Sequence, residues 1–551
     1  MVSKGRGRSK TTRKQLGQYF TPDWVVDYII ENTLGPVIAE DSTRLLGEFT
    51  ILDPACGDGA FLIGALRFLE YQTHTVDTVP RELLLRSIVD SIHGIDVDPK
   101  ALKKCHRRLR KTSKQLLDVA ADFSQRVLLG NSLIQPDSQA KTVYGSKLAK
   151  IHPVDWHRVY PWVMRDGGFD VIVGNPPFIG IKALDTRLKT YLRHRYRTVE
   201  QQFDILVPFI ELGLNLLRPG GRLGYIISNK VLAADYGIRL RQTLVKNYVI
   251  EQMVDLSNLN IFENAATYPH ILIIRKPRGP QDLQQHNVQL IPSPTQPQEL
   301  GTSSTDVTLL PQHYYANLPK TILSPFLSEE KYVILRKMLH NTIPLGQACS
   351  IRCGIAKTGF TKHLLSKDAY SKLSKTKKRK TLPFLNAGDV RRYHLRQRKY
   401  VTYDPKLVST DQWNDFKEPK LVIAGMAKQI RASLDSEGHA LGRVYYITQK
   451  RAPYNPLFLL GLLNSRLINT YFTLLFFATH LRSSYIRYNA TYLEQIPLPT
   501  PTKHQEDELA ELVAYIVQNP KYLKKGLDWE IDQIVANLYG LSEKDILQFE
   551  G

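Results

Sequence analysis

The sequence predicts an α/β fold, with a doubly wound, Rossmann-like domain followed by a mixed α+β domain. Short apolar runs alternate with helical patterns through residues 16–276, which is typical of a mostly parallel sheet with helices on both faces. A Gly-x-Gly turn follows the first run and opens a helix, as in nucleotide-binding βα units. The β-branched run 171–173 is followed by Pro176 and Pro177, which can continue neither the hydrogen bonds of a strand nor a helix.

The composition favours a polyanionic partner. The formal net charge of the 551 residues is +22. A chain with this imbalance repels itself, so nucleic acid is favoured over the alternative, a generally basic protein with no such partner. The four cysteines include no C-x-x-C pair. We therefore expect no metal site, no disulfide framework and a reducing, cytoplasmic location.

Two segments bear on membrane targeting. Residues 1–15 are rich in Lys and Arg but have no apolar stretch, so we expect a basic N-terminal arm rather than a secretory signal. The apolar run 456–478 contains Asn464, Arg466 and Asn469, which would be costly in hydrocarbon. A buried helical segment is therefore expected there, and no membrane partner.

Polar side chains follow the first predicted strands. Strands over 49–53 and 92–97 bring Asp53 and Asp96 to their ends. An acid at the second position suits two ribose hydroxyls, although an inserted helix makes the spacing longer than in the usual fingerprint. The third strand, 127–129, precedes Asn131, whose amide can bond an adenine edge; a plain turn is the alternative. Carboxyl ends of parallel strands share one edge, so these groups predict a nucleotide site.

A helix is predicted to start near Thr21 and Pro22. Thr21 has the side chain of a helix cap and Pro22 suits the first turn. A helix N-terminus with a free hydroxyl can hold a carboxylate. Every capped helix offers the same, so this element alone identifies no ligand.

The stretch 175–178, Asn-Pro-Pro-Phe, is the strongest chemical signal. It places an amide, a fixed proline carbonyl and an aromatic ring at the carboxyl end of a buried strand. The two oxygens can accept both N–H bonds of an exocyclic amino group, and the ring can stack on a planar base. The alternative is a strand-end turn with an ordinary core Phe.

The second half of the chain is dense in basic residues. Residues 277–304 contain many Pro, Gln and Ser and are predicted to be a linker or long loop. A target-recognition domain is expected over 305–502, and terminal helices over 503–551. Basic residues interleaved with tyrosines suit phosphate contact with stacking, with a solvated basic face as the alternative. The predicted contacts to DNA are Lys377, Lys378, Arg379, Lys380, Arg391 and Arg392.

Four segments in this order, 19–22, 52–59, 94–99 and 175–178, resemble motifs of the γ-class, TaqI-type DNA adenine-N6 methyltransferases. Segments 460–465, 485–488 and 495–499 resemble that family's target-recognition domain more loosely. The resemblance implies site-specific methyl transfer from S-adenosylmethionine to adenine N6 in duplex DNA after base flipping. It also implies the modification component of a restriction-modification or related defence system. A monomer is expected, with a separate restriction endonuclease or defence-system subunits as possible partners.

The resemblance also implies residue roles. It places Thr21 and Pro22 near the cofactor's methionine end. It forms the turn around the cofactor from Asp53, Pro54, Ala55, Cys56, Gly57 and Gly59. It places Asp96 and Val97 at the ribose. It places Asn131 and Ser132 at the cofactor adenine, and the family more often carries Asp at the position of Asn131. At the target amino group it places Asn175, Pro176 and Pro177, with Phe178 and Phe262 stacking on the flipped base.

Other functions are weighed against this one. An RNA or protein-glutamine N-methyltransferase can use the same Asn-Pro-Pro-Phe, but such enzymes seldom need so long a basic C-terminal half. A non-catalytic DNA-binding subunit would not need intact Asp53, Asp96 and Asn175. A fused nuclease would draw on Glu418-Pro419-Lys420, but this E-x-K enters an apolar strand, and such tripeptides are frequent in a chain this charged.

Overall fold

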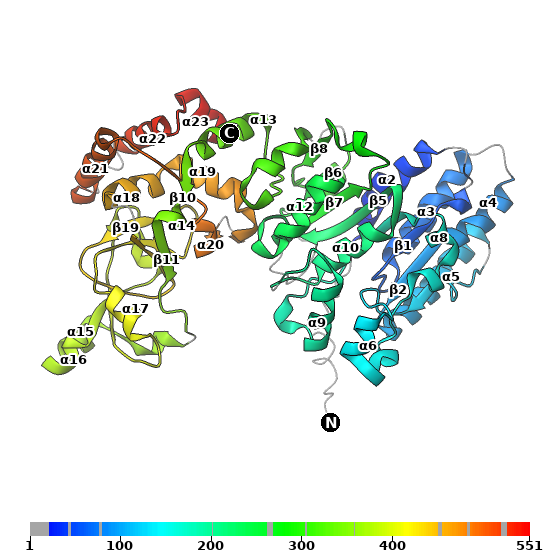
Figure 1. The fold of residues 1–551 in the computed structure, drawn as a ribbon, viewed down its shortest axis with the longest axis horizontal. Helices are drawn as coiled ribbons and strands as arrows, with labels where there is room; N and C mark the ends of the chain where they lie inside the picture. The colour runs from blue at the N-terminus through cyan, green and yellow to red at the C-terminus, as the bar shows by residue number, and fades with distance from the viewer. Residues whose placement is uncertain are drawn as a thin grey trace. The chain divides into compact units, whose positions relative to one another are not determined.

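The computed structural model describes residues 21–550, apart from 42–43, 45, 76–79, 119, 201, 260, 262–267, 303–305, 358, 450–453, 482–484 and 520–525. The chain divides into two compact units, Met1–Phe326 and Leu327–Gly551, whose elements are labelled in Figure 1. The first unit is α/β and the second is mixed α+β. The predicted linker, 277–304, contains a strand of the first unit's sheet, so that prediction is wrong and the boundary lies later in the chain.

In the described part of the first unit, a 9-stranded sheet has the order β3-β2-β1-β4-β5-β7-β6-β8-β9. The strands from β3 to β5 run parallel, and β7 is antiparallel to both of its neighbours. The strands are β1 (Ile51–Asp53), β2 (Ile92–Asp96), β3 (Val127–Leu129), β4 (Phe169–Gly174), β5 (Leu217–Ser228), β6 (Val249–Asp255), β7 (Pro269–Arg275), β8 (Asn287–Ile291) and β9 (Thr308–Pro311).

Helices cover both faces of this sheet. A Cβ on Gly224 of β5 would lie 2.7 Å from an isoleucine of α2 (Asp23–Glu40). A Cβ on Gly213 of α10 (Leu206–Leu216) would lie 2.4 Å from Leu223, also in β5. Adjacent strand residues point to opposite faces, so α2 and α10 lie on opposite sides and the doubly wound prediction is confirmed. The unit's other α-helices are α3 (Ala60–Gln72), α4 (Arg81–Ser87), α5 (Pro99–Leu117), α6 (Ser138–Tyr144), α7 (Trp156–Val159), α8 (Pro161–Arg165), α9 (Thr186–Arg195), α11 (Lys230–Ala233) and α12 (Ile238–Asn247).

The order of the strands reverses between β1 and β4. From β1 the sheet continues through β2 to β3, and from β4 it continues to β5. Ligands of open α/β sheets bind outside the carboxyl ends of the strands at such a switch point. The ends concerned are Asp53 of β1 and Gly174 of β4.

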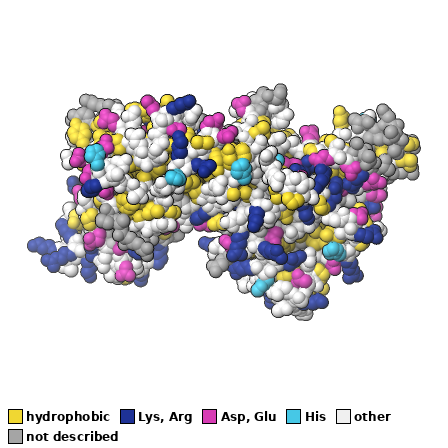
Figure 2. Space-filling model, turned by 45° about the horizontal axis from the view of Figure 1, so that its top comes forward, with side chains coloured by type: hydrophobic (Ala, Val, Ile, Leu, Met, Phe, Trp, Pro, Cys, Tyr) yellow, Lys and Arg dark blue, Asp and Glu magenta, His cyan; other side chains and the backbone are white. Residues whose placement is uncertain are grey.

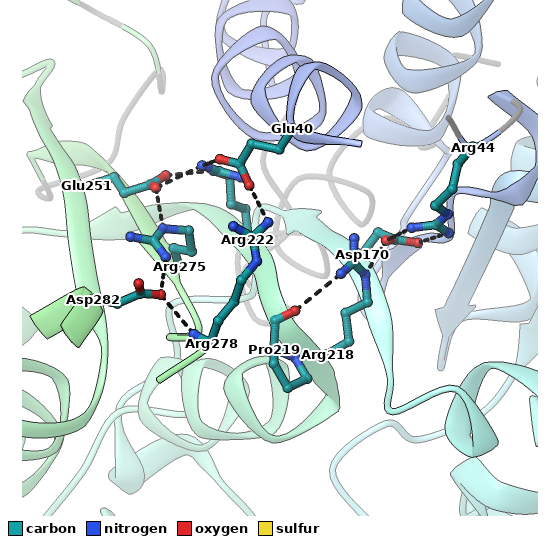
Figure 3. A network of polar contacts seen from close by, with 10 residues as sticks. All are labelled: Glu40, Arg44, Asp170, Arg218, Pro219, Arg222, Glu251, Arg275, Arg278 and Asp282. Atoms are coloured by element: carbon teal, nitrogen blue, oxygen red, sulfur yellow. Dashed lines mark hydrogen bonds and ion pairs between the residues drawn. The ribbon is translucent and has the colours of Figure 1, made fainter. Parts of the chain in front are cut away.

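The amino edge of the sheet holds an ion-pair network (Figure 3). Asp170 of β4 accepts hydrogen bonds from Arg44 at 2.6 Å, from Arg218, and from the backbone and hydroxyl of Thr50 at 2.8 and 2.9 Å. Burial alone would raise the pKa of Asp170, but the hydrogen bond from Arg44 and the charge of Arg218 outweigh it and hold the pKa below its ordinary value. These contacts join the segment before β1 to β4 and β5.

A second part of the network joins α2 to three strands. Arg222 of β5 donates to Glu40, the last residue of α2, at 2.6 Å and to Glu251 of β6 at 2.8 Å. Arg275 of β7 also donates to Glu251, at 2.9 Å. A buried charge is costly unless it is paired, and Arg222 has two carboxylate partners, Glu40 and Glu251. The network therefore fixes the end of α2 across the sheet.

The second unit is built from small sheets and helices. Its strands are β10 (Thr342–Pro344), β11 (Cys349–Cys353), β12 (Leu364–Leu365), β13 (Thr381–Leu385), β14 (Val390–Arg391), β15 (His394–Leu395), β16 (Lys399–Thr402), β17 (Lys420–Ala424), β18 (Met426–Ala427), β19 (Ala432–Asp435), β20 (Ala440–Leu441), β21 (Val444–Gln449), β22 (His480–Leu481), β23 (Tyr485–Arg487) and β24 (Pro497–Pro499). Its α-helices are α13 (Glu329–Leu339), α14 (Leu345–Ala348), α15 (Lys367–Ser371), α16 (Lys375–Arg379), α17 (Thr410–Asp415), α18 (Pro456–Asn464), α19 (Arg466–Leu475), α20 (Ala490–Leu493), α21 (Lys503–Gln518), α22 (Leu527–Leu538) and α23 (Glu543–Glu550). The apolar run 456–478 forms the largely buried α18 and α19, as predicted. Across the described ranges, no helix is long and apolar enough to cross a membrane.

A buried ion pair stabilises the second unit. The Lys420 ammonium donates to Asp435 and to the Phe416 carbonyl, each at 2.6 Å, and both charged side chains have no exposed surface. His439 contacts the same carboxylate at 2.7 Å. Burial alone would raise the pKa of Asp435, but His439 and Lys420 lower it to about 2. Lys420 is thus part of the core and has no exposed side-chain surface with which to act on DNA. The structure therefore argues against a nuclease motif at Glu418-x-Lys420.

We predict that Asp170→Ala destabilises the protein by about 3–5 kcal/mol, because it leaves two arginines without a buried partner. The folded-state pKa of Asp170 is lowered, so its contribution is complete above the unfolded value of ~3.9 and is lost as the pH falls below that. Denaturant melts at pH 7 and pH 3 would measure both effects. The control is Asp118→Ala, whose side chain is 93% exposed. An equal loss in both variants would contradict the role of the network.

Candidate active site

Asn175 leaves the end of β4 at the switch point. It is half-buried, Pro176 is buried, and Pro177 is half-buried. The Asn175 Nδ2 donates to the hydroxyl of Thr21 at 3.1 Å. This bond fixes the plane of the amide, in which the oxygen points away from Thr21, on the other side of Cγ from the nitrogen. A hydrogen-bond acceptor is therefore held in a fixed direction at the crevice.

The position of Thr21 differs from the prediction. The helix begins at Asp23 and its N-cap residue is Pro22, which makes no side-chain cap. Thr21 is 4% exposed and uses its hydroxyl on Asn175 instead of on the helix. The sequence pattern suggested a capping threonine because it could not reveal this partner, 154 residues away.

Asp53 lies beside the start of this turn. A Cβ on Gly174 would lie 2.9 Å from Asp53 Oδ1, so the glycine leaves room for the Asp53 carboxylate beside the end of β4. Asp53 is 1% exposed and accepts from the backbone N–H of Ala55 at 3.0 Å. Burial raises the pKa of Asp53 to about 8, assisted by the charge of Asp96, despite the bond from Ala55. The carboxyl is thus ready to ionise when a cation binds beside it.

The glycine turn is folded against Asp96. Gly57 and Gly59 have φ of 55° and 88°, a region that favours glycine. The Gly57 N–H donates to Asp96 Oδ2 at 2.8 Å, and the Asp98 N–H donates to Oδ1 at 2.7 Å. Asp96 is 8% exposed, and burial raises its pKa. The next residue, Val97, is 60% exposed.

The remaining residues of the turn have structural contacts. A Cβ on Gly59 would lie 2.6 Å from the sulfur of Cys105, so α3 approaches α5 closely there. Cys56 is buried, and its N–H donates to the Ile95 carbonyl at 3.0 Å. The Pro54 carbonyl accepts from the hydroxyl of Ser132 at 2.6 Å.

Asn131 closes a tight turn after β3. Its Oδ1 accepts from the N–H of Leu133 at 3.2 Å. Together with the Ser132 bond, this ties the exit of β3 to the glycine turn. The two residues therefore lie at the same edge as Asp53 and Asp96, as predicted, and their role toward a ligand stays a prediction.

Phe178 is half-buried and packs at the margin of the core. The backbone around it is held by Asp204, whose carboxylate accepts from the N–H groups of Ile179 and Leu206. Burial raises the pKa of Asp204. Sequence analysis missed this residue, although an acid close to the start of a helix, here α10, is a signal for it. Phe262, predicted to stack on the second face of a base, lies outside the described residues.

The predicted DNA contacts of the second unit divide into two groups. Lys377, Arg379, Lys380 and Arg391 are exposed and Lys378 is half-buried; Figure 2 shows Lys and Arg side chains gathered over α15 and α16. Arg392 instead donates to both oxygens of Asp528 at 2.9 Å and to the Asn464 carbonyl at 3.0 Å. Its prediction as a phosphate contact is corrected to a structural role, because both terminal nitrogens of its guanidinium already donate to groups of the same unit.

The tyrosines near these residues are also engaged. The rings of Tyr370 and Tyr400 stack on each other, with centroids 4.0 Å apart and planes at 2°. The Lys378 ammonium lies 5.6 Å from the Tyr370 centroid. Tyr393 is 2% exposed. The tyrosines therefore build this surface, and the predicted base stacking is not favoured.

Comparisons with known proteins agree with this geometry. Residues 90–262 match the family model of the Eco57I restriction-modification methylase, and residues 382–498 match that of the TaqI-like C-terminal specificity domain. The Type II methyltransferase M.BstVI of Geobacillus stearothermophilus is 25% identical over 96% of this chain and 97% of its own length. The Type II restriction enzyme and methyltransferase RM.Eco57I of Escherichia coli is 28% identical over 46% of this chain and 27% of its own length.

A solved structure shares the fold over nearly the whole chain. The Type IIL restriction-modification enzyme MmeI in complex with DNA aligns with a TM-score of 0.61 and 14% sequence identity, covering 98% of this chain and 76% of that one. The two family models and the relatives confirm the resemblance predicted from the sequence. The chain resembles the restriction-modification adenine methyltransferases in both of its units, with an Eco57I-type methylase domain followed by a TaqI-like specificity domain.

Proposed function

We propose that this protein transfers a methyl group from S-adenosylmethionine to N6 of an adenine in duplex DNA, after the base is flipped out of the helix. One juxtaposition supports this most. The Asn175 amide, hydrogen-bonded to Thr21, follows the end of β4. Asp53 and the glycine turn lie beside it, at the end of β1. An acceptor for an amino group and a turn suited to a nucleotide-like cofactor thus share one crevice.

The residues at the glycine turn fit this cofactor. A Cβ on Gly57 would meet nothing within 4 Å, so the backbone there is open to a ligand. The Asp96 carboxylate would hold the ribose, and the exposed Val97 side chain would cover the adenine. Asp53 would lie near the positive charges of the amino-acid end. When bound, S-adenosylmethionine supplies an electrophilic methyl group on a sulfonium.

The protein's own part in the reaction is positioning. The N6 lone pair of adenine is delocalised into the ring and is weakly nucleophilic. The Asn175 oxygen and the Pro176 carbonyl would accept both N6 hydrogen bonds, which favours a tetrahedral nitrogen and directs its lone pair into the crevice. Phe178 would stack on the base, which is unreachable inside the duplex. Asp204 would keep the backbone after Phe178 in place.

The proposal also covers the oligomeric state and the partners of the protein. M.BstVI, a methyltransferase by name, matches along 97% of its length, which supports a modification enzyme. We propose that this protein works as a monomer, beside a separate restriction endonuclease or other defence-system subunits. Methylation-sensitive sequencing of DNA from an expressing host would identify the recognition site. Tritium transfer to duplex DNA, RNA and protein in parallel would test the substrate, and label in RNA or protein alone would refute the proposal.

We predict that Asn175→Ala lowers methyl transfer by about 10²–10³-fold, the usual cost of removing one transition-state hydrogen bond. The affinity for S-adenosylmethionine should stay within a few-fold, because the amide faces the target. Single-turnover transfer and equilibrium cofactor binding measure the two quantities. Asn287→Ala, on an exposed residue of β8, is the control. Substantial residual transfer by the Asn175 variant would contradict its role.

We predict that S-adenosylmethionine binds more tightly as the pH rises through about 8, the pKa of Asp53. A cationic ligand stabilises the ionised carboxylate, so binding below this pH releases a proton. Calorimetry in buffers of different ionisation enthalpy at pH 7 would detect the proton. Asp53→Asn should bind weakly without this pH dependence. A wild-type affinity that is constant from pH 6.5 to 9 would exclude the coupling.

We predict that replacing Lys377, Arg379 and Arg391 by Gln flattens the salt dependence of DNA binding. Each lost phosphate contact should reduce the slope of log K against log salt by about 0.9. Arg392→Gln should leave the slope unchanged and instead lower stability by about 1–3 kcal/mol, because it removes charge-assisted hydrogen bonds. Fluorescence anisotropy at several salt concentrations and thermal melts distinguish the two. An unchanged slope in the triple variant would identify these residues as a solvated face.

A further inference from the structure

The segment 182–197 of the first unit is strongly basic. It contains six Lys and Arg residues and one acid, Asp185. The Asp185 carboxylate caps α9 by accepting from the N–H of Arg187 at 3.0 Å, so it serves the helix rather than a basic side chain. A sizeable part of the chain's net charge of +22 is therefore concentrated beside the Asn-Pro-Pro-Phe turn.

One side of α9 is anchored to the exit of β3. Tyr191 and Leu192 are buried. The Tyr191 hydroxyl donates to Asp137 at 3.0 Å and accepts from the N–H of Gln135 at 3.0 Å. Just after the helix, the Tyr196 hydroxyl donates to the Leu133 carbonyl at 3.0 Å. The helix thus packs on α6, beside which it lies in Figure 1.

The segment before α9 is anchored to the exit of β4. Ile181 donates to the Phe203 carbonyl, and Ile205 donates to the Ile179 carbonyl, each at 3.0 Å. Gly180 pairs with Asp204 in an isolated bridge. Both ends of the segment therefore stand at the carboxyl edge of the sheet, one at β3 and the other at the turn that carries Phe178.

Four basic residues in α9 or just before it reach solvent. Arg187 and Arg193 are exposed, Lys189 is half-buried, and Lys182 is exposed just before the helix. Lys189 and Arg193 are four residues apart and share the face away from Tyr191, whereas Arg187, four residues before Tyr191, lies at the edge of the buried stripe with its side chain exposed. We call Lys182, Arg187, Lys189 and Arg193 the α9 basic surface.

We propose that the α9 basic surface binds the DNA phosphates next to the flipped adenine. This rests on the proposed function, since it presumes a duplex at the crevice. A flipped nucleotide rotates about its own backbone, so the phosphates beside it must be held while the base enters the pocket. Lys and Arg side chains make such contacts and position the duplex without reading its sequence. Because α9 is attached to the exits of β3 and β4, phosphates bound by this surface would be held in a fixed position relative to the pocket.

The test is the triple variant Lys182→Gln, Arg187→Gln, Lys189→Gln, which leaves the buried Tyr191 and Leu192 unchanged. Its slope of log K against log salt for duplex DNA should be less steep by about 0.9 per lost contact, up to three contacts. The KM for DNA should rise at least tenfold at 150 mM salt. The S-adenosylmethionine affinity and melting temperature should stay as in the wild type.

A matched control removes the same charge from α5. Lys103, Arg107 and Lys111 are exposed on that helix, which packs against α3, and their triple Gln variant should keep the wild-type slope. An equal change in both variants would mean that only overall charge matters and would overturn the proposal. An unchanged slope in the α9 variant would also overturn it.

The phosphates themselves provide an independent measurement. Methylphosphonates beside the target adenine should weaken wild-type binding but add little to the defect of the α9 variant, since both remove the same contacts. Fully additive effects would overturn the proposal. A wild type that binds duplex DNA but transfers no methyl group would refute the proposed function while leaving the phosphate contact measurable.

Discussion

The packing of the Asp53 carboxylate against Gly174, at the carboxyl ends of β1 and β4, is the constraint on which the candidate site depends. A side chain at Gly174 would collide with the carboxylate of Asp53, so the glycine leaves room for this carboxylate between the two strand ends. The Asn175 amide starts from one end and the glycine turn from the other. A displacement of about 1 Å between bound reactants can cost a hundredfold in rate. The missing Cβ of Gly174 therefore affects how the Asn175 amide is aligned with the glycine turn.

The two edges of the central sheet use carboxylates in different ways. At the amino edge, arginines hold the pKa of Asp170 low and the charges neutralise one another (Figure 3). At the carboxyl edge, burial raises the pKa of Asp53, Asp96 and Asp204. The amino edge thus stabilises the fold, whereas the carboxyl edge keeps acidic groups in an unfavourable environment that a cationic ligand would relieve. Such perturbed groups are typical of functional sites.

The basic residues of the chain also fall into two roles. Arg222, Arg392 and Lys420 pair with carboxylates inside their own units. Lys182 and Arg187 of the α9 basic surface, and Lys377 and Arg379 of α16, are instead exposed to solvent. A count of Lys and Arg along the sequence cannot separate these roles. The difference lies in whether an acidic partner reaches the side chain, since a paired guanidinium gains little from a phosphate.

The sequence by itself determined the doubly wound domain, the strand ends at Asp53 and Asp96 and the rigid turn at Asn175. These features depend on local properties: apolar periodicity, the conformational freedom of glycine and the fixed φ of proline. Only the tertiary structure decided that residues 277–304 add a strand to the sheet, that Arg392 pairs with Asp528, and that α9 stands between the exits of β3 and β4. Each of these depends on a partner far away in the chain, and a local pattern contains no information about which distant group will meet it.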